Sequence, residues 1–331
     1  MLEEVKNIVT IGASAGGIPA VSRLVESFPE NLDAAVFIVI HLGRESLAHV
    51  ILSQIQRSTA LICKIPVDGE LIENNIIYLA PADRHMMLEH GRIIVKKGAF
   101  ENHWRPSIDV LFRSAAAAYS SCVTGVVLTG LLDDGTSGML AIKKSGGRCI
   151  IQETSEAEFP DMPVNVQRNM TVDYELPVQE IGHVLSDLFS RSECLPTEVP
   201  DDVKLEAQIT LRMSSNVEDQ LALGNFTPFT CPDCGGILAK TSNEGSIVRY
   251  RCYTGHTFTE SVLEAEQIRS IEESLWVAIR MLEERKNLLG SMLNSEKPER
   301  IERASHLKVH IERLKDMLLK IGDIDNESQS K

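Results

Sequence analysis

Short hydrophobic runs alternate with helical patterns along the first 190 residues of the chain. The runs at residues 8–11 and 36–40 are apolar or β-branched at every position, which is typical of strands covered on both faces of a parallel sheet. Further strand-like runs lie at residues 61–65, 76–79, 123–128 and 149–151, and helical patterns lie between them at 19–28, 107–119 and 138–144. This alternation predicts an α/β fold over residues 1–190, with a doubly wound, mostly parallel, Rossmann-like sheet.

The pattern changes after residue 190. Residues 191–225 begin with a proline-rich, acidic stretch, which is typical of a linker. A compact cysteine-bearing module follows at residues 226–258. Over residues 259–325, apolar residues recur at steps of three and four in two series that Pro298 separates. This periodicity predicts either a helical hairpin or a dimeric coiled coil.

Composition and charge limit the kinds of partner that the chain can have. Its 331 residues exceed what one hydrophobic core usually serves, so two or more folded units are expected. The formal net charge of −14 argues against nucleic acid as the main partner and against docking on anionic lipid. The N-terminus carries no cleavable apolar signal, and no run reaches the ~18 apolar residues of a membrane span. We therefore expect a cytoplasmic protein that does not insert into membranes.

Four of the seven cysteines are scattered along the chain, and three of these four lie beside apolar strand-like runs. They are Cys63, Cys122, Cys149 and Cys194. In a reducing compartment such thiols are more often buried small hydrophobes than disulfide partners. We therefore expect these four residues to be unpaired.

Residues 12–17, of sequence Gly-Ala-Ser-Ala-Gly-Gly, follow the first predicted strand and precede a helix. They fit the pattern G-x-S-x-G, in which small neighbours permit the sharp turn that exposes a serine hydroxyl, here that of Ser14. Free backbone N–H groups at the helix start, that of Ala15 among them, are candidates for holding an oxyanion. A glycine-rich turn is also compatible with a dinucleotide or phosphate loop. However, Ser14 occupies the place of the middle glycine of that fingerprint, and the second strand ends in His41 rather than in an acidic residue.

His41 and Asp134 follow two other predicted strands. Because the carboxyl ends of adjacent parallel strands lie side by side, Ser14 and His41 can project into one crevice. The strand at residues 123–128 leads to Asp133 and Asp134, and a carboxylate there could orient the imidazole. Considered alone, His41 could be a hydrogen-bonded residue at the edge of the sheet. Asp133 and Asp134 could likewise belong to an ordinary solvent-exposed turn. The convergence of three such groups on one edge favours a hydrolase.

These segments resemble the catalytic domain of the chemotaxis methylesterase family (CheB) from about residue 9 to residue 185. The resemblance rests on residues 11–17, 39–41, 78–85, 105–112, 128–135 and 152–163. It implies a catalytic triad of Ser14, His41 and Asp134, because the family's aspartate directly precedes the glycine, as Asp134 does and Asp133 does not. It implies an esterase that removes methyl esters from glutamates of a methylated receptor-like protein, that can deamidate glutamines, and that needs no cofactor for catalysis.

The chain departs from the family's usual pattern at several places. Ala15 stands where a threonine usually follows the nucleophile, and Leu131-Leu132 stands where Met-Gly is usual, which puts receptor specificity in doubt. Family members commonly carry an N-terminal receiver domain. A nucleophile at residue 14 leaves no room for one, so we do not expect regulation by phosphorylation of this chain. Arg105 has two interpretations, as a group that steers an acidic substrate segment and as a structural residue.

The cysteine module contains a second constellation. Cys231 and Cys234 form C-x₂-C, and Cys252 and His256 follow as C-x₃-H. Three thiolates and one imidazole are a common ligand set for tetrahedral structural zinc. A redox C-x-x-C is the lesser alternative, because it leaves Cys252 and His256 unexplained. Some methylesterase-like proteins resemble this arrangement of ribbon and helical tail, which implies partner binding or self-association through the C-terminal helices.

The sequence thus supports a protein-glutamate methylesterase as the first hypothesis. The alternative is a non-catalytic adaptor or signalling scaffold that retains the fold. A nucleotide-binding protein is the third.

Overall fold

A computed structural model of the chain describes residues 5–41, 48–191, 194–241, 247–291 and 297–329. The chain divides into two compact units, Met1–Glu260 and Ser261–Lys331. The first unit contains a parallel sheet with its helices and the cysteine module. The second unit is helical.

The parallel sheet of the first unit has seven strands in the order β3-β4-β2-β1-β7-β8-β9, and every neighbouring pair is parallel. The strands are β1 (Ile8–Ala13), β2 (Ala35–Ile40), β3 (Ile62–Lys64), β4 (Ile76–Leu79), β7 (Val123–Val127), β8 (Arg148–Gln152) and β9 (Tyr174–Leu176). The predicted α/β class with a parallel sheet is confirmed. Strand β1 lies between β2 and β7, so the three segments that follow these strands meet at one edge.

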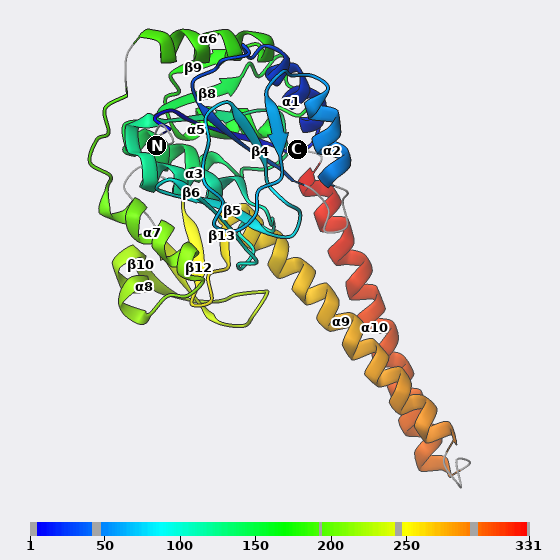
Figure 1. Cartoon of the computed structure of the whole chain (residues 1–331). Coiled ribbons are helices and arrows are strands. Elements are labelled where there is room, and N and C mark those ends of the chain that lie inside the picture. The colour runs from blue at the N-terminus through cyan, green and yellow to red at the C-terminus, as the bar shows by residue number, and fades with distance from the viewer. Residues whose placement is uncertain (1–4, 42–47, 192–193, 242–246, 292–296, 330–331) are drawn as a thin grey trace. The chain divides into compact units, whose positions relative to one another are not determined.

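Helices cover both faces of this sheet (Figure 1). One face packs against α1 (Gly17–Glu26), α2 (Ala48–Gln56) and α6 (Val178–Arg191), and the other against α3 (Ile108–Tyr119), α4 (Thr136–Lys144) and α5 (Asp161–Asn169). Neighbouring strand residues serve opposite faces: Ile8 belongs to the core under α3, whereas Val9 belongs to the core under α1. Strands β1 and β2 are buried at every position because both faces are covered, which explains why β2 is apolar throughout and β1 contains only one polar residue, the β-branched Thr10.

An antiparallel pair, β5 (His85–Glu89) and β6 (Arg92–Lys96), lies outside the main sheet. It packs on α3, with Met86 and Leu88 in the same core as that helix. A short 3₁₀ turn, η1 (Ser120–Cys122), connects α3 to β7.

The segment expected to be a linker contains two helices, α7 (Asp201–Arg212) and α8 (Val217–Leu223). Helix α7 packs against α3 and buries Val203, Ala207 and Glu206. Val203 and Ala207 are spaced as one apolar stripe of a helix. The burial of Glu206 could not be predicted from the sequence, because acidic residues are mostly exposed.

A disulfide joins Cys122 to Cys194. Our expectation of unpaired thiols is therefore wrong for these two cysteines. They are 72 residues apart in the sequence, and only the fold brings their Cα atoms to 5.5 Å. Cys63 and Cys149 are free and buried, as expected, and burial raises the pKa of Cys63 to about 11 and that of Cys149 to about 12.

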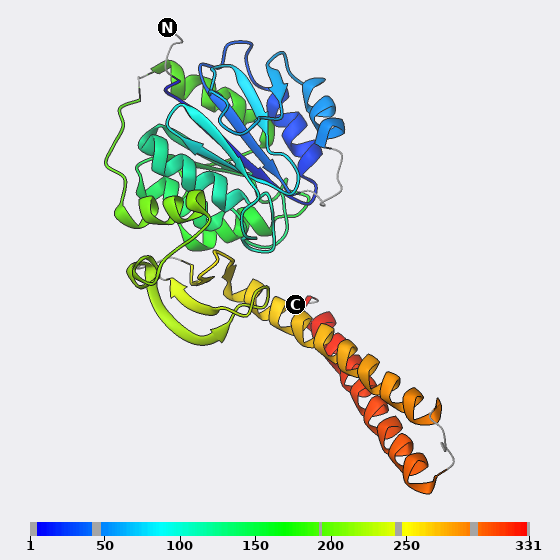
Figure 2. The same ribbon diagram turned by 60° about the horizontal axis from the view of Figure 1, so that its bottom comes forward.

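The cysteine module is a four-stranded antiparallel sheet (Figure 2). Its strands are β10 (Gly224–Thr230), β11 (Ile237–Thr241), β12 (Arg249–Cys252) and β13 (Thr257–Thr259). Cys231 and Cys234 lie in the turn that follows β10, Cys252 is the last residue of β12, and His256 lies in the turn that leads to β13.

The second unit is formed by α9 (Glu260–Ser291) and α10 (Pro298–Gln329), which lie side by side and antiparallel in both views (Figures 1 and 2). Ile279 of α9 and Ile311 of α10 are buried. Among the described residues, no helix combines the length and the apolar character that a membrane crossing requires.

Candidate active site

Ser14 is the first residue after β1, in the turn that leads into α1. Its backbone N–H donates to the carbonyl of Thr129 at 3.0 Å, and Gly16 in the same turn has a φ of 69°, which glycine adopts without strain. Gly130 lies close on the other side: a Cβ there would be 2.8 Å from the Cβ of Ser14 and 2.0 Å from Sδ of Met162. The absence of a side chain at Gly130 therefore lets the segments after β1 and β7 approach each other.

His41 is the first residue after β2, and its ring connects the other two predicted triad residues. Its Nδ1 lies 3.1 Å from Oγ of Ser14, and its Nε2 lies 2.7 Å from Oδ2 of Asp134. The side chains of His41 and Asp134 are each 1% exposed. In this geometry the neutral ring donates from Nε2 to the carboxylate, which leaves the Nδ1 lone pair directed at the serine hydroxyl.

Asp134 lies against the N-terminus of α3. Its two oxygens accept hydrogen bonds from the backbone N–H of Ile108 at 2.8 Å, from that of Asp109 at 3.2 Å and from Oγ of Ser107 at 3.0 Å. Burial by itself raises the pKa of Asp134. The hydrogen bond to His41, the charge of His41 and the backbone N–H groups of Ile108 and Asp109 lower this pKa, and the net result lies below the usual range. Asp134 is therefore ionised and already has its full set of donors before any substrate binds.

Trp104 covers the imidazole. The rings of His41 and Trp104 are stacked, with centroids 4.1 Å apart and planes within 7° of each other. An indole face favours a cation above it, so the stack is suited to stabilise the imidazolium. Trp104 could not be predicted at this position, because nothing in the sequence pattern shows that residue 104 returns to the end of β2.

Asp109 is a second buried carboxyl group beside the triad. Its Oδ1 accepts from the backbone N–H of Gly135 at 3.0 Å and of Gly138 at 2.6 Å, and its Oδ2 accepts from Nδ2 of Asn102 at 3.1 Å. Burial, and then the negative charge of Asp134, raise the pKa of Asp109 well above its usual range. Asp109 therefore fixes the loop that follows Asp134. An acidic residue in the first turn of a helix usually faces solvent and makes no such contacts.

Ala15 and Arg105 were the other two predicted residues near the triad. Among the described residues, none accepts a hydrogen bond from the Ala15 backbone N–H, whereas the Ala15 carbonyl accepts from Oγ1 of Thr129 at 3.1 Å. The guanidinium of Arg105 is engaged within the protein: it pairs with Asp83, donates to the carbonyl of Gly98 at 2.7 Å and lies 4.1 Å from the ring centroid of Phe100. These contacts agree with the structural interpretation of Arg105. Its steering of substrate stays a prediction.

The four predicted metal ligands are brought together. One ligand atom from each of Cys231, Cys234, Cys252 and His256 lies within 4.8 Å of all the others. Sγ of Cys234 is 3.7 Å from Sγ of Cys252, which in turn is 3.5 Å from Nδ1 of His256. Thiolates bound to tetrahedral zinc at about 2.3 Å lie about 3.8 Å apart. The donor set and its spacing therefore fit a zinc ion.

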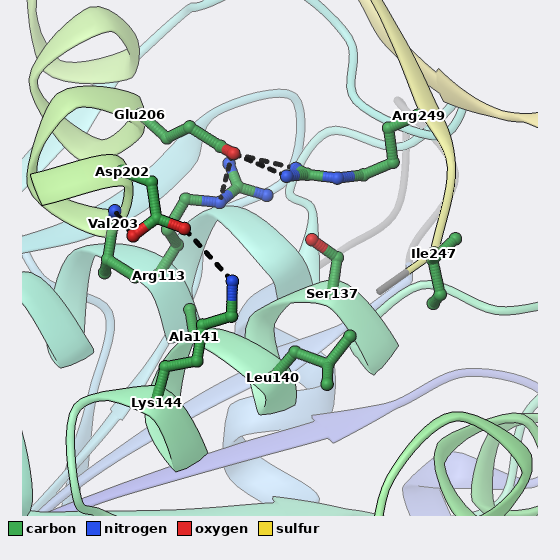
Figure 3. Close-up of a pocket in the computed structure, with 10 residues that line it drawn as sticks. All are labelled: Arg113, Ser137, Leu140, Ala141, Lys144, Asp202, Val203, Glu206, Ile247 and Arg249. Atoms are coloured by element: carbon green, nitrogen blue, oxygen red, sulfur yellow. Dashed lines mark hydrogen bonds and ion pairs between the residues drawn. The ribbon is translucent and has the colours of Figure 1, made fainter. Parts of the chain in front are cut away.

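A hollow between α4, α7 and the start of β12 lies apart from the triad (Figure 3). Its charged side chains bond to one another, as Lys144 does to Asp202 and Glu206 to Arg249. The hollow thus contributes no group to the triad.

Comparisons with known proteins identify the family of residues 9–185. The family model described as CheB methylesterase matches residues 9–185. A protein of Methanosarcina mazei named "Protein-glutamate methylesterase/protein-glutamine glutaminase 2" is 34% identical over 186 residues, which cover 54% of this chain and 50% of that protein. A Methanosarcina barkeri protein of the same name without the number is 33% identical over 194 residues, covering 56% of this chain and 53% of that protein. The chain thus spans about half the length of these archaeal relatives.

Among solved structures, the chain is similar to the CheB methylesterase catalytic domain of Thermotoga maritima. The TM-score is 0.53 with 29% sequence identity, over 55% of this chain and 98% of that domain.

Proposed function

This chain belongs to the CheB methylesterase family, and on that premise we propose that it hydrolyses glutamyl methyl esters of a methylated chemoreceptor-like protein, with Ser14 as the nucleophile. The observation that carries the proposal is the hydrogen-bonded series from Ser14 through His41 to Asp134 at the end of three adjacent strands. The names of the archaeal relatives extend the proposal to the deamidation of glutamines.

The reaction is an acyl transfer in two steps. Nδ1 of His41 takes the hydroxyl proton while Oγ of Ser14 attacks the ester carbonyl, and the imidazolium then returns the proton to the departing methoxy oxygen, so that methanol leaves. In the second step the same nitrogen takes a proton from water, which attacks the acyl-serine. The imidazolium then returns this proton to Oγ of Ser14 as the acyl–oxygen bond breaks, and the glutamate leaves as its carboxylate. With a glutamine substrate the leaving group is ammonia.

The surroundings of His41 suit this role. The ionised Asp134 and the face of Trp104 both stabilise the imidazolium that forms in each step. The backbone N–H of Ala15, at the start of α1, is our proposed donor to the oxyanion. The family's usual threonine would add a hydroxyl here, and Ala15 does not supply it.

Methanol release from a methylated chemoreceptor tests the proposal. Replacement of the nucleophile, Ser14→Ala, is expected to lower the rate by at least about 10⁴-fold, because the acyl-enzyme can no longer form. Ser53→Ala is the matched control: Ser53 is exposed on α2, and within the part of the chain that the structure describes it bonds only to the carbonyl of His49. Equal rates for the Ser14 variant and the wild type would eliminate the enzyme and favour the non-catalytic scaffold.

The cysteine module is, in this proposal, a zinc ribbon over residues 226–258. Cys231, Cys234, Cys252 and His256 would hold the ion, which closes all four tetrahedral positions and so supplies structure rather than chemistry. Elemental analysis of freshly prepared chain is expected to find about one zinc per chain, and less in Cys234→Ser. Fresh protein without zinc would contradict this assignment.

The C-terminal helices, residues 259–325, serve assembly in this proposal. The support is a set of apolar side chains that the helix pair leaves about half exposed or more, among them Trp276, Met281, Leu288 and Leu319. A second copy of the same helices would cover them as a coiled coil does.

A further inference from the structure

A short segment of the catalytic domain lies between the triad and the cysteine module. Its centre is Asn102, which is 1% exposed. The backbone N–H of Asn102 donates to the carbonyl of Thr257 at 2.8 Å, and Oδ1 of its side chain accepts from the backbone N–H of Thr259 at 3.2 Å. Thr257 directly follows His256, one of the four candidate zinc ligands, so strand β13 is attached to this segment along its length.

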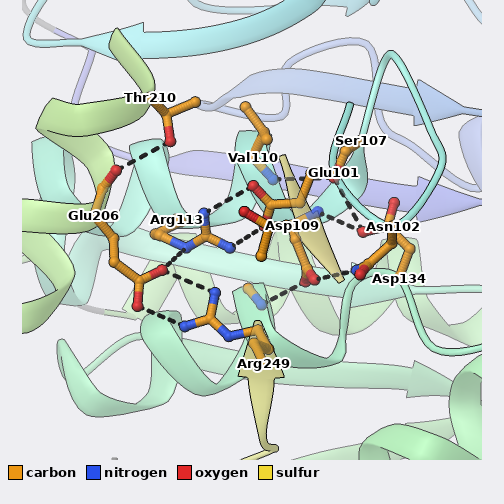
Figure 4. A network of polar contacts seen from close by, with 12 residues as sticks. Glu101, Asn102, Ser107, Asp109, Val110, Arg113, Asp134, Glu206, Thr210 and Arg249 are labelled. Atoms are coloured by element: carbon orange, nitrogen blue, oxygen red, sulfur yellow. Dashed lines mark hydrogen bonds and ion pairs between the residues drawn. The ribbon is translucent and has the colours of Figure 1, made fainter. Parts of the chain in front are cut away.

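The same side chain reaches the triad's support. Nδ2 of Asn102 donates to Oδ2 of Asp109, whose Oδ1 holds the backbone N–H groups of Gly135 and Gly138, on either side of the start of α4. The backbone N–H of Asp109 itself donates to Asp134. Two side chains therefore connect β13 to the carboxylate that orients His41 (Figure 4).

The segment also holds the other face of His41. Glu101 and Trp104 exchange backbone hydrogen bonds, at 3.3 Å from the N–H of Glu101 and at 2.9 Å from that of Trp104. Asn102 has a φ of 49°, a left-handed conformation that turns the chain so that the indole of Trp104 stacks on the imidazole. A displacement of Asn102 would move both the stacked ring and the carboxylate's support.

Buried ion pairs give a second, independent connection. Arg113 of α3 pairs with Glu101 at 2.5 Å and with Glu206 of α7 at 3.0 Å, and Glu206 pairs with Arg249 of β12 at 2.5 Å. Figure 4 shows these four side chains together. The side chains of Arg113, Glu101 and Glu206 are at most 5% exposed, and that of Arg249 is 10% exposed. Separation of the cysteine module from the catalytic domain would break a buried pair and leave an uncompensated charge, which is strongly unfavourable. The ion pairs therefore hold the module firmly against the catalytic domain.

We propose that a zinc ion in the cysteine module controls the esterase, and that Asn102 is the positioning residue through which the ion's occupancy reaches Asp134 and Trp104. Zinc fixes the turn that ends at His256 and so fixes β13. Strand β13 holds Asn102, and Asn102 holds the loop of Asp134 and the segment of Trp104. The metal-free chain is then a slow esterase. This inference rests on the proposed nucleophile, so its test uses a readout that does not need the proposed substrate.

The test follows the rate at which a fluorophosphonate modifies Ser14 in the full chain, by mass spectrometry of the peptide that contains it. Zinc is removed with a chelator, verified by elemental analysis, and restored as Zn²⁺ alone. Loss of zinc is expected to slow the modification of the wild type about tenfold and its return to restore the rate, as loss of a residue that supports a site typically does. An unchanged rate after verified zinc removal would overturn the proposal.

A variant separates this coupling from unfolding of the module. Asn102→Asp keeps the shape and the tolerance of positive φ, but it loses the donor to Asp109 and places a charge beside a buried carboxyl group. With zinc content equal to that of the wild type, this variant is expected to react about tenfold more slowly, with little further loss when zinc is removed. Wild-type reactivity in this zinc-loaded variant would overturn the role of Asn102.

The matched control is Asn75→Asp. Asn75 also has a positive φ, 60°, and its amide also joins separate segments, accepting from the backbone of Leu32 and donating to Asn31, away from the triad. It should react as the wild type does.

Fluorescence supplies a readout of the contact between Trp104 and His41 that does not depend on the reaction at Ser14. The chain has two tryptophans, and in a Trp276→Phe background only Trp104 emits. Its emission is expected to change on zinc removal in the otherwise wild-type chain, because the indole leaves the imidazole, and to be already changed in zinc-loaded Asn102→Asp. Zinc removal that leaves the Trp104 emission unaltered would contradict the coupling.

The outcomes distinguish the two proposals. Modification of Ser14 that follows zinc, without methanol release from a methylated receptor, refutes the substrate and keeps the coupling. Methanol release that is independent of zinc keeps the function and refutes the coupling. No modification of Ser14 in any state refutes both.

Discussion

Asp134 and Asp109 are neighbouring buried carboxyl groups whose pKa values are displaced in opposite directions. The hydrogen bonds that Asp134 accepts outweigh its burial and lower its pKa, whereas burial and the charge of Asp134 raise the pKa of Asp109. Two ionised carboxylates in neighbouring buried positions would repel each other strongly. Ionisation is therefore favoured on Asp134, the residue that bonds to His41, and disfavoured on Asp109, which supports the loop.

This difference predicts which aspartate the reaction needs. Asp134→Asn is expected to lower kcat/KM by about 10⁴-fold, because an amide cannot hold the imidazole in the required tautomer or balance its positive charge. The matched control is Asp133→Asn, one residue earlier in the same loop, which should stay close to the wild type. Methanol release measured for both variants checks this. A larger loss in the Asp133 variant would show that the triad has been assigned to the wrong residue.

The sequence carries enough information to find the triad and too little to find its surroundings. Ser14, His41 and Asp134 each follow an apolar strand, and parallel strands bring such positions to one edge. Trp104 reaches the same edge by a different route, through consecutive left-handed residues at Asn102 and His103, with φ values of 49° and 69°. Asn102 is a residue type that tolerates this conformation, but neither residue is a glycine, so the sequence marks the reversal only weakly.

At the scale of elements, α3 connects the parts of the first unit. Its N-terminus donates to Asp134, its side chain Arg113 carries two buried ion pairs, and most of its length is buried between the sheet, the β5–β6 pair and α7. The alternation of strands and helices predicted this helix and its neighbours in the sheet. It could not predict α7, because the residue that fixes α7 to α3 is Glu206, and its burial depends on Arg113 and Arg249 from distant segments.

The ion pairs of Glu206 make the stability of the first unit depend on pH. Burial raises the pKa of Glu206, but Arg249 and Arg113 together lower it from 4.5 to about 2. The stabilisation is therefore complete above pH 4.5 and is lost as the pH falls through about 2. Glu206→Gln is expected to lower the free energy of unfolding near neutral pH, because it removes the charge that the arginines bind. The difference in the free energy of unfolding between the wild type and this variant is expected to be about 2 kcal/mol smaller at about pH 3 than near neutrality.

Urea unfolding of both chains at the two pH values measures this gap. Glu198→Gln is the control, since Glu198 is exposed in the segment before α7. It should leave the free energy of unfolding unchanged at both pH values. A gap between the wild type and the Glu206 variant that is the same at both pH values would contradict the buried ion pairs.

At the scale of the whole molecule, the proposed assembly through the second unit predicts an oligomer. Light scattering during size-exclusion chromatography is expected to give a mass of at least two chains. Met281→Glu combined with Leu288→Glu should return the mass to that of one chain, because charges at these exposed apolar positions oppose burial. Glu284→Gln, on the same helix, is the control. A single-chain mass for the wild type would contradict the assembly role.

The central claim is that one hydroxyl of this chain performs the ester hydrolysis. The most direct measurement titrates the chain with a fluorophosphonate and compares the remaining methanol release with the fraction of chains that carry the adduct on Ser14. We expect a straight line that reaches zero activity at one adduct per chain. Full methanol release from chains that are completely modified at Ser14, or loss of activity through an adduct on a different serine, would contradict it.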